Sequence, residues 1–339
     1  MTPRITGLLW QGVGDRKSWK WWRRMCPSPG RVRFGSRPWP PESSYDVMLR
    51  QHWFPGVKPP YTPGEDVVGV VDKLGDGVSN LEIGRRVALW TFGEAGGYTE
   101  FICTPADCAV PVPPSLDSAE AVGLVVNYLT ANLALHKMAC VESGERILAH
   151  GAAGGVGSAL VQLGTLAGLE VYGTASAHNH ELVESLGATP IDYRNQDFVV
   201  RIHELTGDGV DAVFDVIGGG RQLWRSYRAL RQGGRLVMLG MAGAVRGGIK
   251  IIPAGMLVVG LVKILPNGKT APMGPGMETY PKEHMDWYRD SLAEFFDLAA
   301  TGKMRPVIAE RFPLLEASHA HEFMERGGYA GKVVLTADA

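Results

Sequence analysis

The sequence has almost no excess charge and no long apolar run. Its 34 lysine and arginine residues nearly balance 35 aspartate and glutamate residues, which leaves a formal net charge of −1 at pH 7. This balance gives no electrostatic reason to expect nucleic acid or an anionic membrane as a partner. The longest apolar candidate, residues 251–265, is interrupted by Pro253 and Lys263 and is too short to span a bilayer.

Cysteine is scarce as well. The four cysteines, Cys26, Cys103, Cys108 and Cys140, show no disulfide framework in their spacing. We therefore expect a reducing compartment, and the start of the chain carries no secretory signal. These features predict a cytoplasmic protein. With 339 residues, of which 45% are hydrophobic, the composition is that of a soluble enzyme with two domains.

A glycine-rich stretch, residues 144–157, predicts a strand, a tight turn and a helix. Residues 147–149 form the expected strand, and residues 155–167 have apolar side chains at helical spacing. Such a turn presents backbone N–H groups beside a positive helix N-terminus, where a pyrophosphate binds. Gly154 leaves room for the phosphate, and Gly157 lets the helix pack closely. Ala152 stands where the usual G-x-G-x-x-G pattern has its first glycine.

Alternating strands and helices follow this turn. Strands are expected at residues 170–174, 210–215 and 235–239, and helices at residues 197–206 and 221–231. This alternation predicts an α/β fold with a doubly wound parallel sheet of the Rossmann type.

The residue that closes the second strand indicates the cofactor. An acid there holds a ribose 2′-hydroxyl and repels a 2′-phosphate. Ser176 occupies this place, no acid follows before Glu181, and Tyr193 and Arg194 follow the third strand. We therefore favour NADP over NAD. His178 and His180 either face the phosphate or lie at a solvated helix start.

The flanking parts of the chain have β character. Residues 66–74, 84–90 and 98–103 are expected strands that are separated by glycine-containing turns, and residues 331–335 form a last strand. Short strands with such turns predict a compact barrel-like domain.

The stretch from Gly144 to Gln162 resembles the quinone oxidoreductase signature of the medium-chain dehydrogenase/reductase superfamily, in its zinc-independent, zeta-crystallin-like branch. Thr165 departs from the basic residue that is expected near the end of this signature. Further similar segments are residues 62–69, 84–87, 96–100, 130–131, 186–188, 233–234 and 331–335. The resemblance covers residues 45–339.

The resemblance implies a domain arrangement and a partner. A GroES-like catalytic domain would comprise residues 1–118 and 302–339, and a Rossmann NADP-binding domain residues 119–301. The active site would lie in the cleft between them. Family members usually form dimers through an edge strand of the Rossmann domain, here expected at residues 256–261. A small-molecule substrate and a homodimer are thus the expected partners.

Residues 1–44 depart from the family pattern. They hold five of the nine tryptophans, and nine basic residues against only two acids, Asp15 and Glu42. One interpretation is a basic, aromatic arm that touches nucleic acid or membrane, and another is a poorly ordered tail. We favour a frame-shifted segment, since the resemblance resumes sharply at Tyr45. Such a chain would lack proper first strands and part of the substrate wall.

The residues argue against a metal. Zinc alcohol dehydrogenases of this superfamily have a catalytic cysteine and a Gly-His-Glu segment whose histidine binds zinc, whereas this chain has Gly64-Glu65-Asp66. The four-cysteine lobe that holds structural zinc is also missing. Catalytic zinc needs about three protein ligands. We therefore predict a zinc-independent protein with no metal.

The resemblance also implies the site residues. Residues 44–54 match the segment that lines the family's active site; Asp46 and Arg50 fit its pattern, and Tyr45 is the candidate proton donor. Alternatively, Tyr45 is a packing residue. The implied cofactor-binding residues are Thr130, Gly154, Gly155, Val156, Ser176, Tyr193, Ile217, Gly218, Gly240 and Lys332.

Three functions agree with this sequence. The first is an NADPH-dependent, zinc-independent oxidoreductase that transfers hydride to a quinone or another activated alkene or carbonyl. The second is an enoyl-thioester or enone reductase, which needs a donor such as Tyr45 for the enolate. The third is an NADPH-binding protein that has lost catalysis and has a structural or RNA-binding role.

Overall fold

The computed structural model describes residues 31–35, 41–42, 46, 62–92, 96–240, 242, 251–272, 274 and 276–337. Its contacts divide the chain into two compact units. Unit 1 comprises Met1–Val126 and Glu278–Ala339, and unit 2 comprises Asn127–Met277. Each unit is described by itself.

Unit 2 is built on a five-stranded parallel sheet. Its strands are β7 (Arg146–His150), β8 (Glu170–Ala175), β9 (Thr189–Asp192), β10 (Val210–Asp215) and β11 (Leu230–Met238). The strand order is β11-β10-β7-β8-β9, and all neighbouring strands are parallel. The chain starts at β7, runs outward to β9 and returns to β10 on the other side of β7. The point where the order reverses therefore lies between β7 and β10, which is where doubly wound sheets bind ligands.

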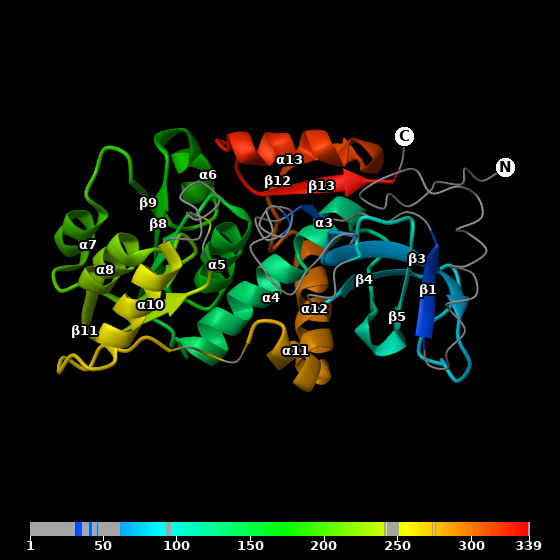
Figure 1. Ribbon diagram of the computed structural model, residues 1–339, viewed down its shortest axis with the longest axis horizontal. Helices are drawn as coiled ribbons and strands as arrows, with labels where there is room; N and C mark the ends of the chain where they lie inside the picture. Colours follow the sequence, from blue (N-terminus) through cyan, green and yellow to red (C-terminus); the bar gives the residue numbers. More distant parts are fainter. Residues whose placement is uncertain are drawn as a thin grey trace. The chain divides into compact units, whose positions relative to one another are not determined.

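Helices cover both faces of this sheet. They are α4 (Val126–Leu133), α5 (Gly155–Leu166), α6 (His180–Ser185), α7 (Phe198–Thr206), α8 (Gly220–Ala229) and α10 (Ile251–Val262). A π-helical turn, Ala134–Met138, follows α4, and a short 3-10 helix, Ala177–Asn179, precedes α6. Helices α7, α8 and α10 lie together on one face, and α5 lies on the other (Figure 1). The core of the first face joins Leu148 and Val213 of the sheet to Ile202, Leu223 and Val259 of these helices.

The expected edge strand at residues 256–261 is wrong, because this segment belongs to helix α10. Val258, Val259 and Val262 are buried, whereas Leu257 and Leu261 are exposed. This spacing is helical and packs one side of the segment on α8. No helix among the described residues is long and apolar enough to cross a membrane.

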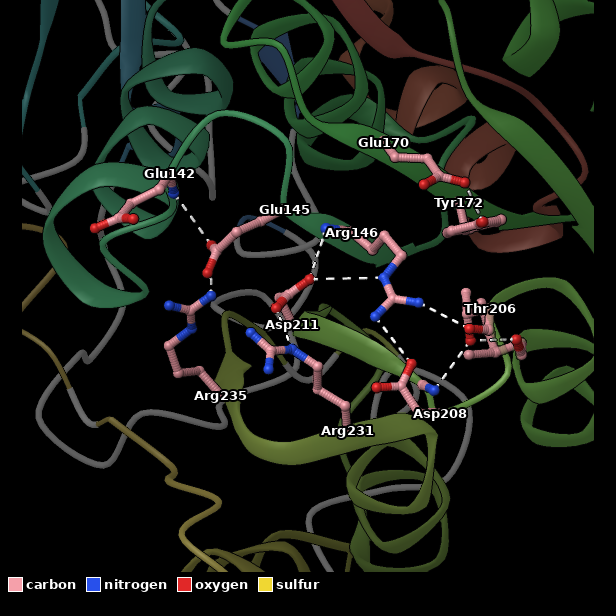
Figure 2. A network of polar contacts seen from close by, with 12 residues as sticks. Glu142, Glu145, Arg146, Glu170, Tyr172, Thr206, Asp208, Asp211, Arg231 and Arg235 are labelled. Atoms are coloured by element: carbon pink, nitrogen blue, oxygen red, sulfur yellow. Dashed lines mark hydrogen bonds and ion pairs between the residues drawn. The ribbon is translucent and has the colours of Figure 1, made fainter.

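A polar network joins the amino ends of the strands in unit 2 (Figure 2). Asp211 at the start of β10 accepts a hydrogen bond from the Arg146 N–H at 2.8 Å and pairs with the Arg231 guanidinium. Arg146 also reaches Asp208 at 2.9 Å, and Arg235 reaches Glu145 at 2.5 Å. Because these residues come from β7, β10, β11 and their preceding loops, the network fixes the strands at the edge opposite to the glycine turn.

Unit 1 contains two sheets. The first has the order β5-β1-β3-β4-β6 and the second the order β12-β13-β2. The strands are β1 (Arg31–Gly35), β2 (Pro41–Glu42), β3 (Asp66–Leu74), β4 (Arg86–Trp90), β5 (Phe101–Pro105), β6 (Val110–Pro111), β12 (Ile308–Pro313) and β13 (Lys332–Thr336). The helices are α3 (Ser118–Gly123), α11 (Thr279–Glu283), α12 (Met285–Ala300) and α13 (Ala317–Arg326), with short 3-10 helices at Ala106–Cys108 and Leu314–Glu316.

Two strands of unit 1 come from the atypical first 44 residues. Strand β1 pairs antiparallel with both β3 and β5, and β2 pairs with β13. The expectation that the chain lacks first strands is thus wrong for residues 31–35 and 41–42. Backbone pairing tolerates many side chains, so an unfamiliar sequence can still complete a sheet. The rest of residues 1–44 lies outside the described residues.

Cys103 on β5 takes part in a disulfide, although the spacing of the four cysteines indicated no disulfide framework.

The division into units differs from the predicted boundaries at residues 118 and 302. Helix α12 groups with the β-rich unit because the Tyr288 hydroxyl donates to the Cys108 carbonyl at 2.8 Å and accepts from the Trp90 N–H at 3.0 Å. Buried aromatic and polar contacts of this kind fix a helix to one sheet, whereas helical periodicity does not indicate its partner.

Candidate cofactor site

The glycine turn lies between β7 and α5, as the sequence predicted. Gly154 precedes the first residue of α5, and the first turn of any helix leaves N–H groups without acceptors inside that helix. Among the described residues, a Cβ built on Gly154 would have only the Gly151 carbonyl oxygen within 4 Å, at 3.3 Å. A Cβ on Gly157 would lie 2.0 Å from the same oxygen. Gly157 is therefore needed for packing, and Gly154 leaves open the space that a phosphate would occupy.

Two neighbours of the turn had no role in the sequence argument. A Cβ on Gly155 would lie 2.4 Å from the Asn127 side-chain nitrogen, so the buried Asn127 of α4 packs on this glycine. A Cβ on Gly173 of β8 would lie 2.6 Å from the methyl group of Ala152. Gly173 therefore makes room for the alanine that stands where the usual fingerprint has a glycine.

The residues predicted for the 2′-phosphate follow two adjacent strands. Ser176 follows β8, Tyr193 follows β9, and the last residues of these strands are paired, so the two residues emerge at the same edge. Ser176 is buried, while Tyr193 is exposed and lies beneath the Arg194 guanidinium, 5.8 Å from the ring centroid. The Arg194 Nε donates to the Tyr193 hydroxyl at 3.4 Å. This edge thus offers a hydroxyl and a guanidinium, which are groups that bind phosphate.

A carboxylate lies at the same edge. Asp192 accepts hydrogen bonds from the Arg194 N–H at 3.0 Å and from the Asn195 amide at 2.6 Å. The backbone N–H of Arg194, followed by the Asn195 side chain, holds the pKa of Asp192 below its usual value. Its negative charge is therefore held by donors of its own loop.

The two nearby histidines differ in their surroundings. His178 is exposed, and its Nε2 lies 3.4 Å from the Ser176 hydroxyl. His180 has a buried Nε2 without a hydrogen-bond partner among the described residues. Because His178 reaches Ser176, it stands at the expected phosphate position more directly than His180.

The loop after β10 carries the predicted Ile217 and Gly218. Both backbone N–H groups donate to the Asp215 Oδ1, at 2.9 Å and 2.8 Å. Gly240 follows β11, and a Cβ there would lie 3.1 Å from the Val216 carbonyl oxygen. The fully buried Asp215 fixes this loop and was not predicted as a site residue. The sequence could have indicated this role, because Asp215 is an acidic residue at the end of an apolar strand.

Thr130 and Lys332 lie in different units. Thr130 is buried on α4 in unit 2. Lys332 begins β13 in unit 1, where its buried amine forms an ion pair with the buried Asp66.

Of the predicted catalytic residues, only Asp46 lies within the described part of the chain. Its carboxylate is buried and accepts the Gly64 N–H at 2.8 Å. Tyr45 and Arg50 lie outside the described residues. The structure adds Glu65, which is buried and whose Oε1 has no hydrogen-bond partner among the described residues. Burial, followed by the charges of Asp46, Asp66 and Glu278, raises the pKa of Glu65 to about 9.

A zinc site does not fit the described residues. No cluster of three or more histidine, cysteine, aspartate or glutamate side chains able to hold a metal occurs among them. Gly64 and Glu65 lie beside Asp66, whose carboxylate is already used by Lys332.

Comparisons with known proteins agree with this architecture. Residues 43–114 match the family described as alcohol dehydrogenase GroES-like domain, and residues 186–335 match the family described as zinc-binding dehydrogenase. Quinone oxidoreductase of Rattus norvegicus is 32% identical over 280 residues, which cover 81% of this chain and 80% of the relative. The chain belongs to the quinone oxidoreductase-like part of the medium-chain dehydrogenase/reductase superfamily. It is thus related to oxidoreductases, and the predicted fold class, a GroES-like domain with a Rossmann domain, is confirmed.

Solved structures of this superfamily extend the likeness over nearly the whole chain. A mycobacterial protein complexed with NADPH is 27% identical, with a TM-score of 0.78 and 92% of each chain covered. CurK enoyl reductase is 26% identical, with a TM-score of 0.77 and 92% of each chain covered.

Proposed function

We propose that this protein is an NADPH-dependent reductase of quinones or other activated alkenes and carbonyls. The bound cofactor would supply the hydride. The Gly151–Gly155 turn would bind the pyrophosphate, Ser176 and Arg194 the 2′-phosphate, and Ile217 and Gly218 the nicotinamide ribose. The relatives named quinone oxidoreductase and the NADPH complex support this proposal. We further propose that the reaction uses no zinc.

The proposal of NADPH rather than NADH rests on the residues that follow β8 and β9. A carboxylate at the end of β8 would accept the ribose 2′-hydroxyl of NADH and repel a 2′-phosphate. The residue there is Ser176, and the Arg194 guanidinium follows the neighbouring strand. A guanidinium can form bidentate hydrogen bonds with an oppositely charged phosphate, whereas a hydroxyl is neutral and offers a single acceptor oxygen.

An Arg194→Gln variant tests this assignment. The KM for NADPH should rise about tenfold, since hydrogen bonds to charged groups contribute about 1.5–3 kcal/mol. The KM for NADH should stay unchanged. Arg201→Gln is the matched control, because Arg201 is a half-exposed arginine on α7 that pairs with Glu204. Equal changes for both cofactors in Arg194→Gln would contradict the proposed phosphate contact.

Glu65 favours reduction of an enone or an enoyl thioester as a second candidate function. Hydride addition to such a substrate leaves an enolate that must be stabilised and protonated, whereas a quinone product anion is delocalised. A carboxyl group with a pKa of about 9 is protonated at neutral pH and can donate that proton. Tyr45, from the sequence prediction, is the competing donor.

Two conservative variants separate these donors. If Glu65 donates, Glu65→Gln should lower enone turnover by about a hundredfold or more while quinone turnover falls far less. Tyr45→Phe should then have little effect. The reverse pattern would assign the proton to Tyr45, and equal losses with both substrates would remove the donor role from either residue.

A further inference from the structure

A buried row of polar side chains crosses the sheet of unit 2 at the carboxyl ends of β8, β7 and β10. The His150 Nδ1 lies 3.0 Å from the Thr174 hydroxyl, and its Nε2 lies 3.0 Å from the Ser226 hydroxyl. The Ser226 hydroxyl donates to the Asp215 Oδ2 at 2.7 Å. All four side chains are at most 3% exposed. These hydrogen bonds connect β8, β7 and β10 through the Ser226 side chain of α8.

The carboxylate at one end, together with a neutral imidazole, sets the direction of every hydrogen bond in this row. Asp215 only accepts, so Ser226 donates to it and must accept from the His150 Nε2–H. The His150 Nδ1 then accepts from the Thr174 hydroxyl, whose oxygen accepts the Gly151 N–H at 3.2 Å. The neutral imidazole then carries its proton on Nε2, and each hydroxyl has one orientation.

The surroundings of His150 agree with a neutral ring. Burial lowers the pKa of His150, and the charged groups near it are Asp215 and Arg225, which act in opposite directions. The Phe198 ring packs on the imidazole edge-to-face, with centroids 4.7 Å apart, and the Arg225 guanidinium lies over the Phe198 ring, 4.5 Å from its centroid. Arg225 is itself paired with Asp197 at 2.9 Å.

The two ends of the row are loops of the proposed cofactor site. One end is Gly151, which begins the glycine turn, and the other is the Asp215 carboxylate, which holds the N–H groups of Ile217 and Gly218. These loops follow β7 and β10, between which the strand order reverses. The hydrogen bonds of this row all point the same way, from the Gly151 N–H to the Asp215 carboxylate. They join the glycine turn, where the pyrophosphate would bind, to the Ile217–Gly218 loop, where the nicotinamide ribose would bind.

We propose that His150 is a positioning residue: with Thr174, Ser226 and Asp215, it holds the pyrophosphate turn and the Ile217–Gly218 loop at the separation that a nicotinamide dinucleotide spans. The inference rests on the proposed function, since it requires that the cofactor binds here. It assigns no contact between His150 and the cofactor. The row positions the pyrophosphate turn and the Ile217–Gly218 loop, and it leaves the 2′-phosphate edge at Ser176 and Arg194 unaffected.

Dissociation constants of two ligands test this role. NADPH spans both loops, whereas adenosine 2′-monophosphate has neither a pyrophosphate nor a nicotinamide and reports only the Ser176 edge. We would measure both ligands with the wild-type protein, Thr174→Val and Ser226→Ala. Each variant should raise the dissociation constant for NADPH about tenfold and leave that for adenosine 2′-monophosphate within about twofold.

A matched variant controls for stability. Thr206→Val is the same substitution near the opposite edge of the sheet, where the Thr206 hydroxyl donates to the Ile202 carbonyl and accepts the Gly209 N–H. It should lower the melting temperature without changing either dissociation constant. His150→Leu should lose more NADPH affinity than Thr174→Val or Ser226→Ala. If His150→Leu does not fold, these two variants still test the role of the row.

The outcomes separate this inference from the proposed function. If the wild-type protein binds neither NADPH nor NADH, the proposed function fails and the inference fails with it. If the wild-type protein binds NADPH and the variants bind it equally well, only the role of His150 is overturned. A parallel loss of both ligands in folded Thr174→Val or Ser226→Ala would also overturn it, because a general loss of structure would then explain the change.

Discussion

At the residue scale, the chemistry of Glu65 depends on residues far from it in the chain. The sequence shows only that an acid stands between Gly64 and Asp66. The structure surrounds it with Asp46 and Glu278, and burial with these charges raises its pKa to about 9. The buried Lys332 amine is already paired with Asp66. Glu65 is therefore kept protonated at neutral pH, and its chemistry could not be predicted from the local sequence.

This raised pKa predicts the pH dependence of stability. Between the unfolded value of 4.5 and the folded value of about 9, the folded protein holds a proton on Glu65 that the unfolded chain has lost. The free energy of unfolding therefore falls as the pH rises through this range. Glu65→Gln removes this titration, so its melting temperature should decline less than that of the wild type. Glu82→Gln, at an exposed carboxyl group, should follow the wild type. Identical pH profiles for Glu65→Gln and the wild type would contradict the raised pKa.

At the scale of elements, the β7–turn–α5 unit was predictable and α10 was not. The glycine turn is a local pattern: apolar strand, glycines and helix follow one another within the 144–167 region. Segment 251–262 is apolar nearly throughout, so its period did not distinguish a strand from a helix until the sheet and α8 showed which side is buried. The row from Thr174 through His150 to Asp215 was hidden because its members are brought together only by parallel strand pairing.

Two glycine substitutions in the turn should act differently. Gly157→Ala places a Cβ 2.0 Å from a backbone oxygen and should destabilise the protein by about 2 kcal/mol or more. Gly154→Ala meets only one atom at 3.3 Å and has a backbone that alanine adopts, so its melting temperature should stay near that of the wild type. Its affinity for NADPH should fall, because the methyl group occupies the phosphate space. Unchanged NADPH binding by Gly154→Ala, measured by calorimetry, would remove the turn from the cofactor site.

The network at the amino ends of the strands predicts a difference between two aspartates (Figure 2). Asp211 is buried and pairs with both Arg146 and Arg231, whereas the Asp208 side chain is 65% exposed and pairs with Arg146. Asp211→Asn should lower the free energy of unfolding by about 2 kcal/mol. Asp208→Asn should change it by less than about 0.5 kcal/mol. Equal effects of the two variants in urea unfolding would contradict the importance of the buried acid.

At the scale of the whole molecule, the sequence indicated the family and both fold types through motifs that extend from residue 62 to residue 335. The assignment of α12 to the β-rich unit was missed, because it depends on the hydrogen bonds of Tyr288 with Trp90 and Cys108. The homodimer and the frame-shifted origin of residues 1–44 stay predictions. Translation of the neighbouring reading frames and sedimentation of the purified protein would test them.

Cofactor consumption by the purified protein, with a simple quinone and with NADPH or NADH, is the most direct test of the proposed function. We expect turnover with NADPH and at least a tenfold lower kcat/KM with NADH, which corresponds to about 1.4 kcal/mol from the phosphate contacts at Ser176 and Arg194. Equal or faster turnover with NADH would contradict the proposed cofactor. No turnover with either cofactor, in a protein shown to be folded, would contradict the proposed quinone reductase.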